Sequence, residues 1–431
     1  MKYFLVGIKG TGMSALAQCL KSLGYMVVGS DVEGYHFTQQ KLDEKKIPYF
    51  KFDRKNINKF YNYTFIVGYS FDQYNNEEVE ELVYKGISYY YYADFINTFF
   101  QNIKIGVSGT HGKTTVCTLL KTIFKNDTIS YIIGDGSGAG EKDSKYTILE
   151  ACEYKQHFLN YDYNYLVINN IEYDHPDYYN NIDEIINAFK KAAKKAKCII
   201  VNNDDKNARK IKHYSRYTFG IENKSFVTAK ILSQSNTGQK IKINVKNKEY
   251  IFDLPFCGKH MIYNFISAFT VYYLTHNQLV ENIDETINDL LKTYISPKRR
   301  LEKVVINENI IFSDYAHHPS EIENSYNAVK QMYPNHNITI IFQPHTYSRT
   351  IFLCEEFQKV FKDKKVYIMN TFVSRESKDV LKDKMVRDIF VSQKEYNEKE
   401  IRGILKRKNQ VLIFMGAGDI YKEIEKYKRI D

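Results

Sequence analysis

A glycine-rich loop that ends in a lysine and a threonine is the sharpest chemical feature of this sequence. The loop Gly109-Thr110-His111-Gly112-Lys113-Thr114 follows an apolar run and precedes the helix expected over Thr115–Phe124. Glycines let backbone N–H groups approach phosphate oxygens, and a helix N-terminus adds a positive dipole end. The lysine of such a loop neutralises the β- and γ-phosphates, and the threonine hydroxyl binds Mg²⁺. We therefore predict a nucleoside triphosphate site, although Val107 replaces the first glycine of the usual spacing and an ordinary strand-to-helix turn is the alternative.

Acidic residues follow the next two predicted strands. Glu150 and Glu153 come after Tyr146–Leu149, and Asp174 and His175 come after Leu166–Asn169. Ligands of open α/β sheets bind at the carboxyl ends of the strands, where carboxylates can hold a metal that bridges phosphates. We expect His175 to be a metal ligand, and a structural role is the alternative for this histidine.

A second glycine turn lies at the start of the chain. The segment Gly7-Ile-Lys-Gly10-Thr-Gly12-Met13-Ser14-Ala15 is followed by Asp31 at the end of the next predicted strand. This arrangement satisfies the dinucleotide fingerprint, for which NAD is the usual ligand. By itself the fingerprint indicates only a turn that suits a diphosphate.

Polar residues also end three predicted strands near the C-terminus. The segments are Asp314-Tyr315-Ala-His317-His318-Pro, Gln343-Pro-His345-Thr-Tyr-Ser-Arg349 and Met415-Gly-Ala-Gly418-Asp. Two adjacent histidines before a proline suggest a binding site, and a capping or packing role is the alternative for His318.

Short apolar strands alternate with amphipathic helices, which indicates an α/β fold with parallel sheets. We divide the chain into three blocks, 1–98, 99–295 and 296–431. Two-residue alternation over about 225–254 predicts antiparallel hairpins inside the second block. The further expected elements are strands Tyr3–Val6, Met26–Gly29, Tyr63–Val67, Ile103–Val107, Ile310–Phe312, Ile338–Phe342, Val366–Met369 and Val411–Met415, and helices from Met13 to Leu23 and from Lys259 to Leu274.

Composition excludes several classes of protein. The formal net charge of +10 suits anionic ligands, but no basic stripe with interleaved aromatics indicates nucleic acid. The run Lys190–Lys197 has helical spacing and is interpreted as a solvated helix face. Six single cysteines without a CxxC pair fit a reducing cytosol. The N-terminal apolar run is too short for a signal peptide, and no run is long enough for a membrane span, so we expect a cytoplasmic protein without membrane insertion.

Nine motifs in order resemble the Mur ligase family over essentially the whole chain. Beyond the two glycine loops and the three C-terminal strings, they are Glu150-Ala-Cys-Glu-Tyr, Asn170-Ile-Glu-Tyr-Asp-His-Pro-Asp-Tyr, Gly258-Lys-His-Met-Ile-Tyr-Asn264 and Arg299-Arg300. The resemblance implies three domains: an N-terminal Rossmann-like domain, a central phosphate-loop ATPase-type mixed sheet with helices, and a C-terminal doubly wound Rossmann-like domain. They would bind the UDP-sugar, bind ATP, and close over ATP and the amino acid, respectively.

The resemblance is to the members that join L-alanine to the lactyl carboxylate of UDP-N-acetylmuramate in peptidoglycan precursor synthesis. Such a ligase uses ATP and Mg²⁺ and forms an acyl phosphate. A ligase that recycles tripeptide onto the same sugar nucleotide is the closest alternative. An NAD-dependent dehydrogenase would leave the Gly-Lys-Thr loop without a role, and a non-catalytic scaffold would not need Lys113, Glu150, His175 and Asp314 together. The sequence leaves monomer and homodimer open.

The resemblance also implies roles for individual residues. The catalytic set would be Lys113, His175, Arg300 and Asp314. ATP would be bound by Gly109, Thr110, His111, Gly112, Lys113, Thr114, Thr115, His260, Asn264, Arg300 and Asp314. The substrates would contact Gly10, Gly12, Met13, Ser14, Asp31, Ser70, Tyr315, His317 and Arg349, with Arg349 pairing the alanine carboxylate. Thr114, Glu150 and His175 would be metal ligands.

Three positions depart from the family pattern or leave a question open. Thr346 stands where many members have Arg, so one alanine contact is missing or replaced. The usual Ser-Ser-Ala-Ile turn is Gly68-Tyr-Ser70-Phe-Asp here, and only Ser70 carries over. Sister ligases use a carbamylated lysine after the histidine, and Lys190 lies at a comparable distance.

Overall fold

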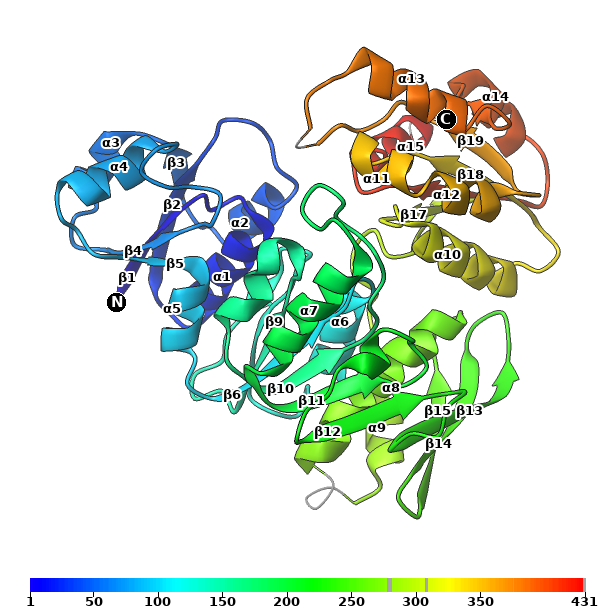
Figure 1. The fold of residues 1–431 in the computed structure, drawn as a ribbon, viewed down its shortest axis with the longest axis horizontal. Coiled ribbons are helices and arrows are strands. Elements are labelled where there is room, and N and C mark those ends of the chain that lie inside the picture. Colours follow the sequence, from blue (N-terminus) through cyan, green and yellow to red (C-terminus); the bar gives the residue numbers. More distant parts are fainter. Residues whose placement is uncertain (277–280, 307–308, 375, 429–431) are drawn as a thin grey trace. The chain divides into compact units, whose positions relative to one another are not determined.

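The computed structural model describes residues 1–276, 281–306, 309–374 and 376–428, and its ribbon is drawn in Figure 1. Contacts group these residues into two compact units. The first unit comprises residues 1–171, 185–228 and 265–283, and the second comprises residues 172–184, 229–264 and 284–431. None of the helices in the described part of the chain combines the length and the apolar character that a membrane span requires.

The first unit begins with a parallel sheet of order β3-β2-β1-β4-β5. Its strands are β1 (Lys2–Val6), β2 (Met26–Asp31), β3 (Tyr49–Lys51), β4 (Thr64–Val67) and β5 (Tyr89–Tyr91). Its helices are α1 (Thr11–Ser22), α2 (Gln39–Glu44), α3 (Arg54–Lys59), α4 (Glu77–Tyr84) and α5 (Tyr92–Phe99). One face of β1 and β4 packs on α3 and α4 through Phe4, Phe65 and Val79. The strand order reverses at β1, which is where ligands of such sheets bind.

The rest of the first unit is built on a central parallel sheet. The strand order is β12-β11-β10-β6-β9-β7-β8, and only β8 runs antiparallel to its neighbour. These strands are β6 (Ile103–Ser108), β7 (Ile129–Ile132), β8 (Gly138–Ala139), β9 (Tyr146–Glu150), β10 (Tyr163–Ile168), β11 (Ala196–Asn202) and β12 (Arg216–Gly220). The helices are α6 (Lys113–Ile123), α7 (Ile182–Ala193) and two short 3₁₀ turns, Tyr154–Asn160 and Ala208–Lys210. Because β6 lies between β9 and β10, the loops after these three strands meet at one edge of the sheet.

Three strands and two helices lie in the sequence between this sheet and the sheet near the C-terminus that is described below. They are β13 (Val227–Gln234), β14 (Gln239–Val245), β15 (Lys248–Leu254), α8 (Lys259–His276) and α9 (Ile283–Leu291). β14 and β15 form an antiparallel hairpin in which buried and less buried residues alternate. The two-residue alternation in the sequence therefore predicted this hairpin correctly.

The second unit contains a sheet of order β16-β17-β21-β18-β19-β20. Its strands are β16 (Glu302–Ile306), β17 (Asn309–Asp314), β18 (Asn337–Phe342), β19 (Lys365–Ile368), β20 (Lys394–Glu395) and β21 (Gln410–Met415). Its helices are α10 (Pro319–Met332), α11 (Tyr347–Phe352), α12 (Cys354–Phe361), α13 (Val380–Ile389), α14 (Glu398–Leu405) and α15 (Tyr421–Lys428). Only β16 is antiparallel among the pairs β16–β17, β17–β21, β21–β18, β18–β19 and β19–β20.

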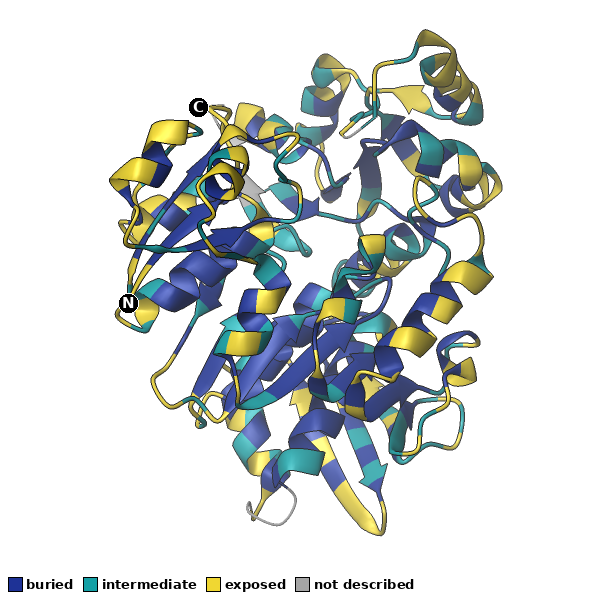
Figure 2. Cartoon of the chain, turned by 60° about the vertical axis from the view of Figure 1, so that its left-hand side comes forward, coloured by how far each residue is buried: buried dark blue, intermediate teal, exposed yellow. Residues whose placement is uncertain are grey.

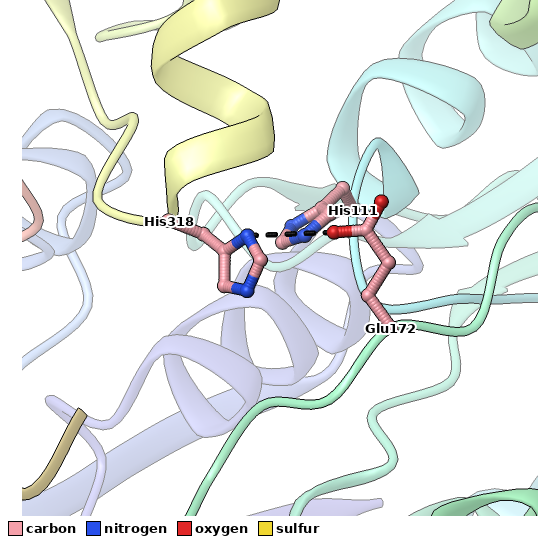
Figure 3. Close-up of side chains that lie close together, drawn as sticks. All are labelled: His111, Glu172 and His318. Atoms are coloured by element: carbon pink, nitrogen blue, oxygen red, sulfur yellow. Dashed lines mark ion pairs between the residues drawn. The ribbon is translucent and has the colours of Figure 1, made fainter. Parts of the chain in front are cut away.

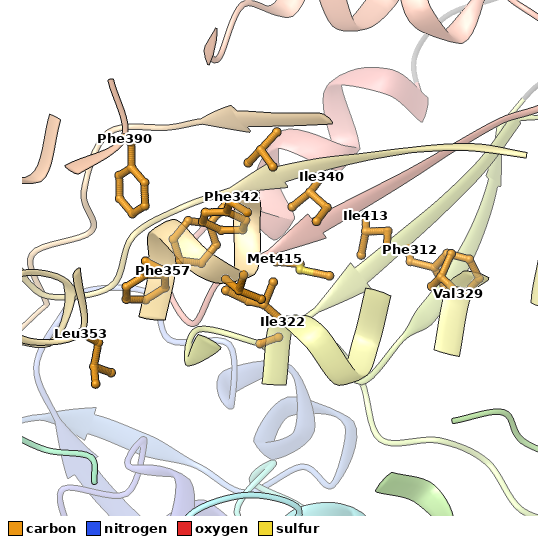
Figure 4. Close-up of a cluster of buried hydrophobic side chains, with 14 of the residues drawn as sticks. Phe312, Ile322, Val329, Ile340, Phe342, Leu353, Phe357, Phe390, Ile413 and Met415 are labelled. Atoms are coloured by element: carbon orange, nitrogen blue, oxygen red, sulfur yellow. The ribbon is translucent and has the colours of Figure 1, made fainter. Parts of the chain in front are cut away.

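Alternate residues of these C-terminal strands enter two different cores. Phe312, Ile340 and Ile413 pack with α10 and α12, and Figure 4 shows the cluster. The neighbouring residues Ile311 and Ile341 pack on the other face with α14 and α15. Because successive strand residues point to opposite faces, both faces of the sheet are apolar and both are covered by helices. Figure 2 shows the result, with buried strands and exposed residues on the helices.

The predicted three-domain α/β fold is confirmed. Its N-terminal and C-terminal domains are Rossmann-like, and its central domain is of the phosphate-loop type. The predicted strands and helices are present, and their ends differ from the predicted ones by at most three residues. The run Lys190–Lys197 is the exception, because α7 ends at Ala193 and β11 begins at Ala196. Its lysines are exposed, as expected, but only its first residues lie on a helix.

The close packing of β6 on β10 leads to a stability prediction. A Cβ at Gly106 would lie 2.3 Å from Cε1 of Tyr163. Since the Tyr163 ring is buried, the change Gly106→Ala should destabilise the protein by about 1–3 kcal/mol. Urea denaturation measures this loss. Gly403→Ala in α14, where a Cβ would meet nothing within 4 Å, is the matched control and should not destabilise. Equal stability of both variants would contradict the prediction.

Candidate functional site

The glycine-rich loop of the first unit joins β6 to α6. Gly112 adopts φ +83° directly before the helix, a conformation that favours glycine. The loop lies against the end of β10, because the N–H of Thr110 donates to the Asn170 carbonyl at 3.0 Å and the N–H of His111 donates to Asn170 Oδ1 at 2.8 Å. Asn170 therefore fixes the loop in a conformation that leaves Lys113 at the start of α6.

Lys113 is held by groups of the loop and of the strand end after β9. Its ammonium donates to the carbonyls of Gly109 at 2.6 Å and Thr110 at 3.1 Å. It also donates to the two carboxylate oxygens of Glu153, at 3.1 and 2.9 Å. Burial acts to lower the pKa of Lys113, but the nearby carboxylates, Glu153 first, outweigh burial and raise the pKa. Lys113 is therefore a charged ammonium in a largely dry setting.

Glu150 is bound by different groups from those that hold Lys113. The Thr114 hydroxyl donates to Glu150 Oε2 at 2.9 Å, and the Gly134 N–H donates to the same oxygen at 2.8 Å. A hydroxyl and a carboxylate oxygen in contact are the hard oxygen ligands that Mg²⁺ prefers. The donor set of Thr114 and Glu150 therefore fits this ion.

The N-terminal glycine turn lies between β1 and α1. Gly7 adopts φ +84°, and its N–H donates to the Ser30 carbonyl at 2.9 Å. Asp31 Oδ2 accepts from the N–H of Lys9 at 2.6 Å, so this carboxylate shapes the turn. A Cβ at Gly12 would meet the Tyr92 hydroxyl at 2.8 Å. The turn thus needs its glycines for close packing as well as for any diphosphate.

The remaining predicted substrate residues of the first unit differ in exposure. Met13 and Ser14 are buried in the first turn of α1. Ser70 is exposed after β4, where its carbonyl accepts from Asn75. Lys190, which was compared with the carbamylated lysine of sister ligases and not predicted to bind substrate, is exposed, and its ammonium lies 3.3 Å from Asn187 Oδ1.

In the second unit, Arg349 of α11 forms a buried ion pair with Asp174. The Arg349 Nε donates to Asp174 Oδ1 at 2.7 Å, and both side chains are less than 10% exposed. Burial acts to raise the pKa of Asp174, but Arg349, His175, His318 and His317 outweigh it and hold the pKa well below its usual range. The Arg349 guanidinium also lies 3.0 Å from His345 Nδ1. The Arg349 guanidinium is therefore held in position by the side chains of Asp174 and His345.

Asp174 also contacts its sequence neighbour. The N–H of His175 donates to Asp174 Oδ1 at 2.7 Å. His175 adopts φ +57°, a left-handed conformation that is uncommon among residues other than glycine. The contact with Asp174 therefore fixes the backbone position from which the His175 side chain extends.

His317 lies close to Arg349 in a cluster of rings. Its Nδ1 is 3.0 Å from the Tyr315 carbonyl and 3.3 Å from Glu321, and its ring contacts His345. Burial, and then repulsion by Arg349, lowers the pKa of His317 to about 3. His317 is therefore a neutral imidazole at physiological pH.

Arg300 lies just before β16, and Asp314 is the last residue of the antiparallel neighbour β17. The Asp314 carboxylate accepts from the N–H groups of Leu301 and Ala316 at 2.8 and 2.7 Å. Burial raises the pKa of Asp314 to about 6. The Arg300 guanidinium lies over the Tyr315 ring, 4.9 Å from its centroid, and 3.7 Å from Glu321. Asp314 thus also ties the end of β17 to the residue directly before β16.

His318 caps α10, which favours the capping interpretation of this residue. Its Nδ1 accepts from the N–H of Ser320 and lies 3.4 Å from Glu172, the pair drawn in Figure 3. The Ser320 hydroxyl donates to Glu172 at 2.6 Å. Glu172 therefore connects the segment before Asp174 to the start of α10.

His260 and Asn264 lie in the first turns of α8. Burial lowers the pKa of His260 to about 4. Its Nδ1 is a buried atom without a hydrogen-bond partner in the described part of the chain. Asn264, one turn later, is 4% exposed. An unbonded ring nitrogen in a buried setting can accept or donate one hydrogen bond to a ligand.

The structure groups the predicted residues by unit. The first unit contains the phosphate loop from Gly109 to Thr115, Glu150, and the N-terminal substrate residues Gly10, Gly12, Met13, Ser14, Asp31 and Ser70. The second unit contains His175, His260, Asn264, Arg300, Asp314, Tyr315, His317 and Arg349. Thr346, which departs from the family pattern, is buried at the start of α11 with φ +66°.

Sequence reasoning missed several partners of these residues. They are Asn170 beside the loop, Glu153 on Lys113, Asp174 on Arg349, and Glu321 beside His317. The sequence shows Glu153 and Asp174 as acidic residues after strands, but it does not identify them as partners of a particular cation. Glu321 had a usable signal, because a glutamate three residues into a helix often bonds backwards to the cap.

Family models match three successive parts of the chain. The model of the Mur ligase family catalytic domain matches residues 2–103, that of the Mur ligase middle domain matches residues 107–272, and that of the Mur ligase glutamate ligase domain matches residues 299–418. The order of the three models follows the N-terminal, central and C-terminal sheets.

The chain is also similar along its whole length to individual proteins. It is 35% identical to a UDP-N-acetylmuramate–L-alanine ligase from Streptococcus sanguinis, over 99% of this chain and 97% of the relative. Identity to the enzyme of the same name from Streptococcus thermophilus is 37%, over 97% and 95%. Among solved structures, the UDP-N-acetylmuramate–alanine ligase from Thermotoga maritima aligns with a TM-score of 0.79 at 23% identity, over 99% of this chain and 98% of that one. A murein peptide ligase from Psychrobacter arcticus aligns with a TM-score of 0.69 at 18% identity, over 100% and 99%. These two structures support the fold alone.

The neutral state of His317 leads to a pH prediction. Its pKa of about 3 in the folded protein lies below the ordinary value near 6.5. As pH falls below about 6.5, the unfolded chain gains a proton that the folded chain does not, so this residue costs stability. The change His317→Gln removes that cost. The free energy of unfolding of the variant, taken relative to that of the unaltered protein, should therefore rise by about 1–2 kcal/mol when the pH falls from 7.5 to 5. Urea denaturation at both pH values measures the difference, and a constant difference would refute it. His36→Gln, at an exposed ring, is the control.

Proposed function

The chain belongs to the Mur ligase family, and on that premise we propose that it joins L-alanine to the lactyl carboxylate of UDP-N-acetylmuramate. The observation that carries this choice is the full-length identity of about 35% to L-alanine ligases. ATP is the energy source, as the lysine and glycines of the phosphate loop suggest. The reaction is a step of peptidoglycan precursor synthesis.

The reaction forms an amide bond in two steps. The lactyl carboxylate attacks the γ-phosphate of ATP, so an acyl phosphate forms and ADP leaves. The amine of L-alanine then attacks the acyl carbon, and the tetrahedral intermediate expels inorganic phosphate. Both steps place negative charge on phosphoryl oxygens, which fixed cations and N–H donors stabilise.

We assign the ATP phosphates to the loop of the first unit. Lys113 neutralises charge on the β- and γ-phosphates, and the N–H groups between Gly109 and Thr115 bind phosphate oxygens. Thr114 and Glu150, already in contact, hold Mg²⁺, and His175 is assigned to a second Mg²⁺. When bound, these ions neutralise phosphate charge. His260 and Asn264 are assigned to adenine, which fits the unbonded Nδ1 of His260.

The sugar nucleotide is assigned to the N-terminal turn. The diphosphate suits the N–H groups near Gly10, Gly12, Met13 and Ser14 at the start of α1. Asp31 supports the turn through the Lys9 N–H. Ser70, exposed after β4, is the proposed uridine-side contact.

The alanine site is assigned to the ring cluster of the second unit. Tyr315 and His317 line it, and Arg349 pairs the alanine carboxylate. The Arg349 Nε donates a hydrogen bond to Asp174, and this salt bridge fixes the guanidinium in one orientation. Arg300 and Asp314 are assigned to ATP, with Asp314 also holding the Leu301 N–H.

We propose domain boundaries of 1–98, 99–295 and 296–431 for the sugar-nucleotide, ATP-binding and closing domains. We also propose a cytoplasmic location. The six cysteines are all free thiols, which suits a reducing compartment. The protein is proposed to act as a monomer or homodimer.

A phosphate-release assay tests the proposed reaction. With ATP, Mg²⁺ and UDP-N-acetylmuramate, L-alanine should stimulate phosphate release far more than a tripeptide, because the tripeptide needs a larger acceptor pocket. The change Lys113→Ala should lower kcat at least about 100-fold, since it removes the cation at the transferring phosphate. Preference for the tripeptide would instead establish the recycling ligase. Unchanged activity of the variant would remove Lys113 from the phosphate site.

A substitution at Arg349 tests the alanine assignment. The change Arg349→Lys keeps the positive charge beside Asp174 but removes the planar guanidinium. We expect the KM for L-alanine to rise about 10- to 100-fold, because a bidentate carboxylate contact is lost. The KM for ATP should change less than about twofold. Steady-state kinetics with each substrate varied in turn give both constants. A similar rise of both constants would contradict the assignment.

A further inference from the structure

Glu153 is a buried carboxylate that none of the proposed reaction steps uses. It follows β9 by three residues, is 2% exposed, and places both oxygens within 3.1 Å of the Lys113 ammonium. Glu150, three residues earlier, bonds the neighbouring Thr114. The two carboxylates of this short segment therefore contact different residues of the same loop.

The contacts of Lys113 show which position its side chain occupies. Besides Glu153, the ammonium bonds the carbonyls of Gly109 and Thr110, so it is folded back over its own loop. An ammonium has three N–H donors, and these four acceptor atoms account for them. A phosphate oxygen can reach this ammonium only by replacing one of the present partners.

Charge decides which partner is replaced. A carboxylate and a phosphate oxygen on the same side of one ammonium repel each other, strongly so in a dry environment. The two loop carbonyls are neutral dipoles and do not compete in this way. The partner that a phosphate displaces is therefore the Glu153 carboxylate.

We propose that Glu153 is the counter-ion of Lys113 in the nucleotide-free enzyme, that the phosphates of ATP displace it, and that its return to Lys113 promotes release of ADP. The inference rests on the proposed function, because it needs Lys113 to be the phosphate-binding lysine. Glu153 is thus a positioning residue that acts through Lys113 and contacts no reacting atom.

The proposal has a thermodynamic consequence with a definite sign. The Glu153–Lys113 pair stabilises the nucleotide-free state, in which the Glu153 carboxylate is the anion bonded to the ammonium. In the bound state the phosphates supply that anion. An interaction that stabilises only the free state weakens binding by the same free energy. Loss of the Glu153 charge should therefore tighten nucleotide binding, the opposite of what loss of an ordinary binding residue does.

The test is the affinity for nucleotide of the variant Glu153→Gln, which keeps the shape and removes the charge. Titration calorimetry with Mg²⁺-ADP, and with Mg²⁺-ATP in the absence of the sugar nucleotide, gives the Kd. We expect both Kd values to fall about five- to twentyfold relative to the unaltered protein. The thermal midpoint of the nucleotide-free variant should fall, and the increase that ADP produces should be larger. Glu153→Asp, which restores the charge, should return the Kd most of the way to its original value.

Turnover gives a second measurement that a purely structural role would not move in this direction. In Glu153→Gln the KM for ATP should fall while kcat falls as well, because ADP leaves more slowly. Unchanged or weaker ADP binding in Glu153→Gln would overturn the proposal. Equal tightening in Glu153→Asp would also overturn it, because the effect would not follow the charge.

Two further variants separate the possible causes. Glu78→Gln removes a buried carboxyl of α4 that is bonded to Asn56 of α3, and it should leave the Kd for ADP unchanged. A Kd that falls in this variant too would attribute the effect to a general loosening and overturn the proposal. Lys113→Ala should weaken ADP binding. If it does not, the phosphate-loop assignment itself fails, whereas normal weakening by Lys113→Ala with no tightening by Glu153→Gln refutes only the role of Glu153.

Discussion

The position of β6 between β9 and β10 is the constraint on which the first unit depends. All three strands are parallel, so their carboxyl ends lie at one edge of the sheet. That edge receives the glycine-rich loop, the Glu150–Glu153 segment and Asn170. The main-chain pairing of the strands therefore brings one ammonium and two carboxylates together before any ligand is bound.

Buried charge is balanced inside each unit by the same means. Lys113 is paired with Glu153 in the first unit, and Arg349 is paired with Asp174 in the second. A buried charge left without a partner would cost several kcal/mol, so these pairs are a condition for folding as well as a feature of the site. Under the proposed role of Glu153, nucleotide binding would exchange one partner of Lys113 for another, and affinity would be set by the difference between the two pairings. The proposed alanine contact of Arg349 instead keeps the Asp174 pair.

Local sequence was a good guide wherever a feature depends on neighbouring residues. The apolar runs placed β17, β18, β19 and β21 of the C-terminal sheet, though not its two outer strands β16 and β20. The alternation near Lys240 predicted the β14–β15 hairpin. It was a poorer guide where one pattern continues across a boundary. The lysines from Lys190 keep helical spacing past the end of α7 at Ala193, because Ala196 already belongs to the buried strand β11.

The sequence by itself determined which residues are proposed to carry chemistry. The motifs around these residues are short runs of neighbouring residues, and such runs can be recognised without knowledge of the fold. The residues are Lys113, Glu150, His175, Asp314 and Arg349. Only the tertiary structure decided which acid faces which base. Glu153 lies 40 residues from Lys113, and Asp174 lies 175 residues from Arg349. Such pairings follow from strand order and packing, and no spacing in the sequence encodes them. For the same physical reason the sequence predicted a phosphate loop, whereas the structure alone revealed that its lysine already has an anionic partner.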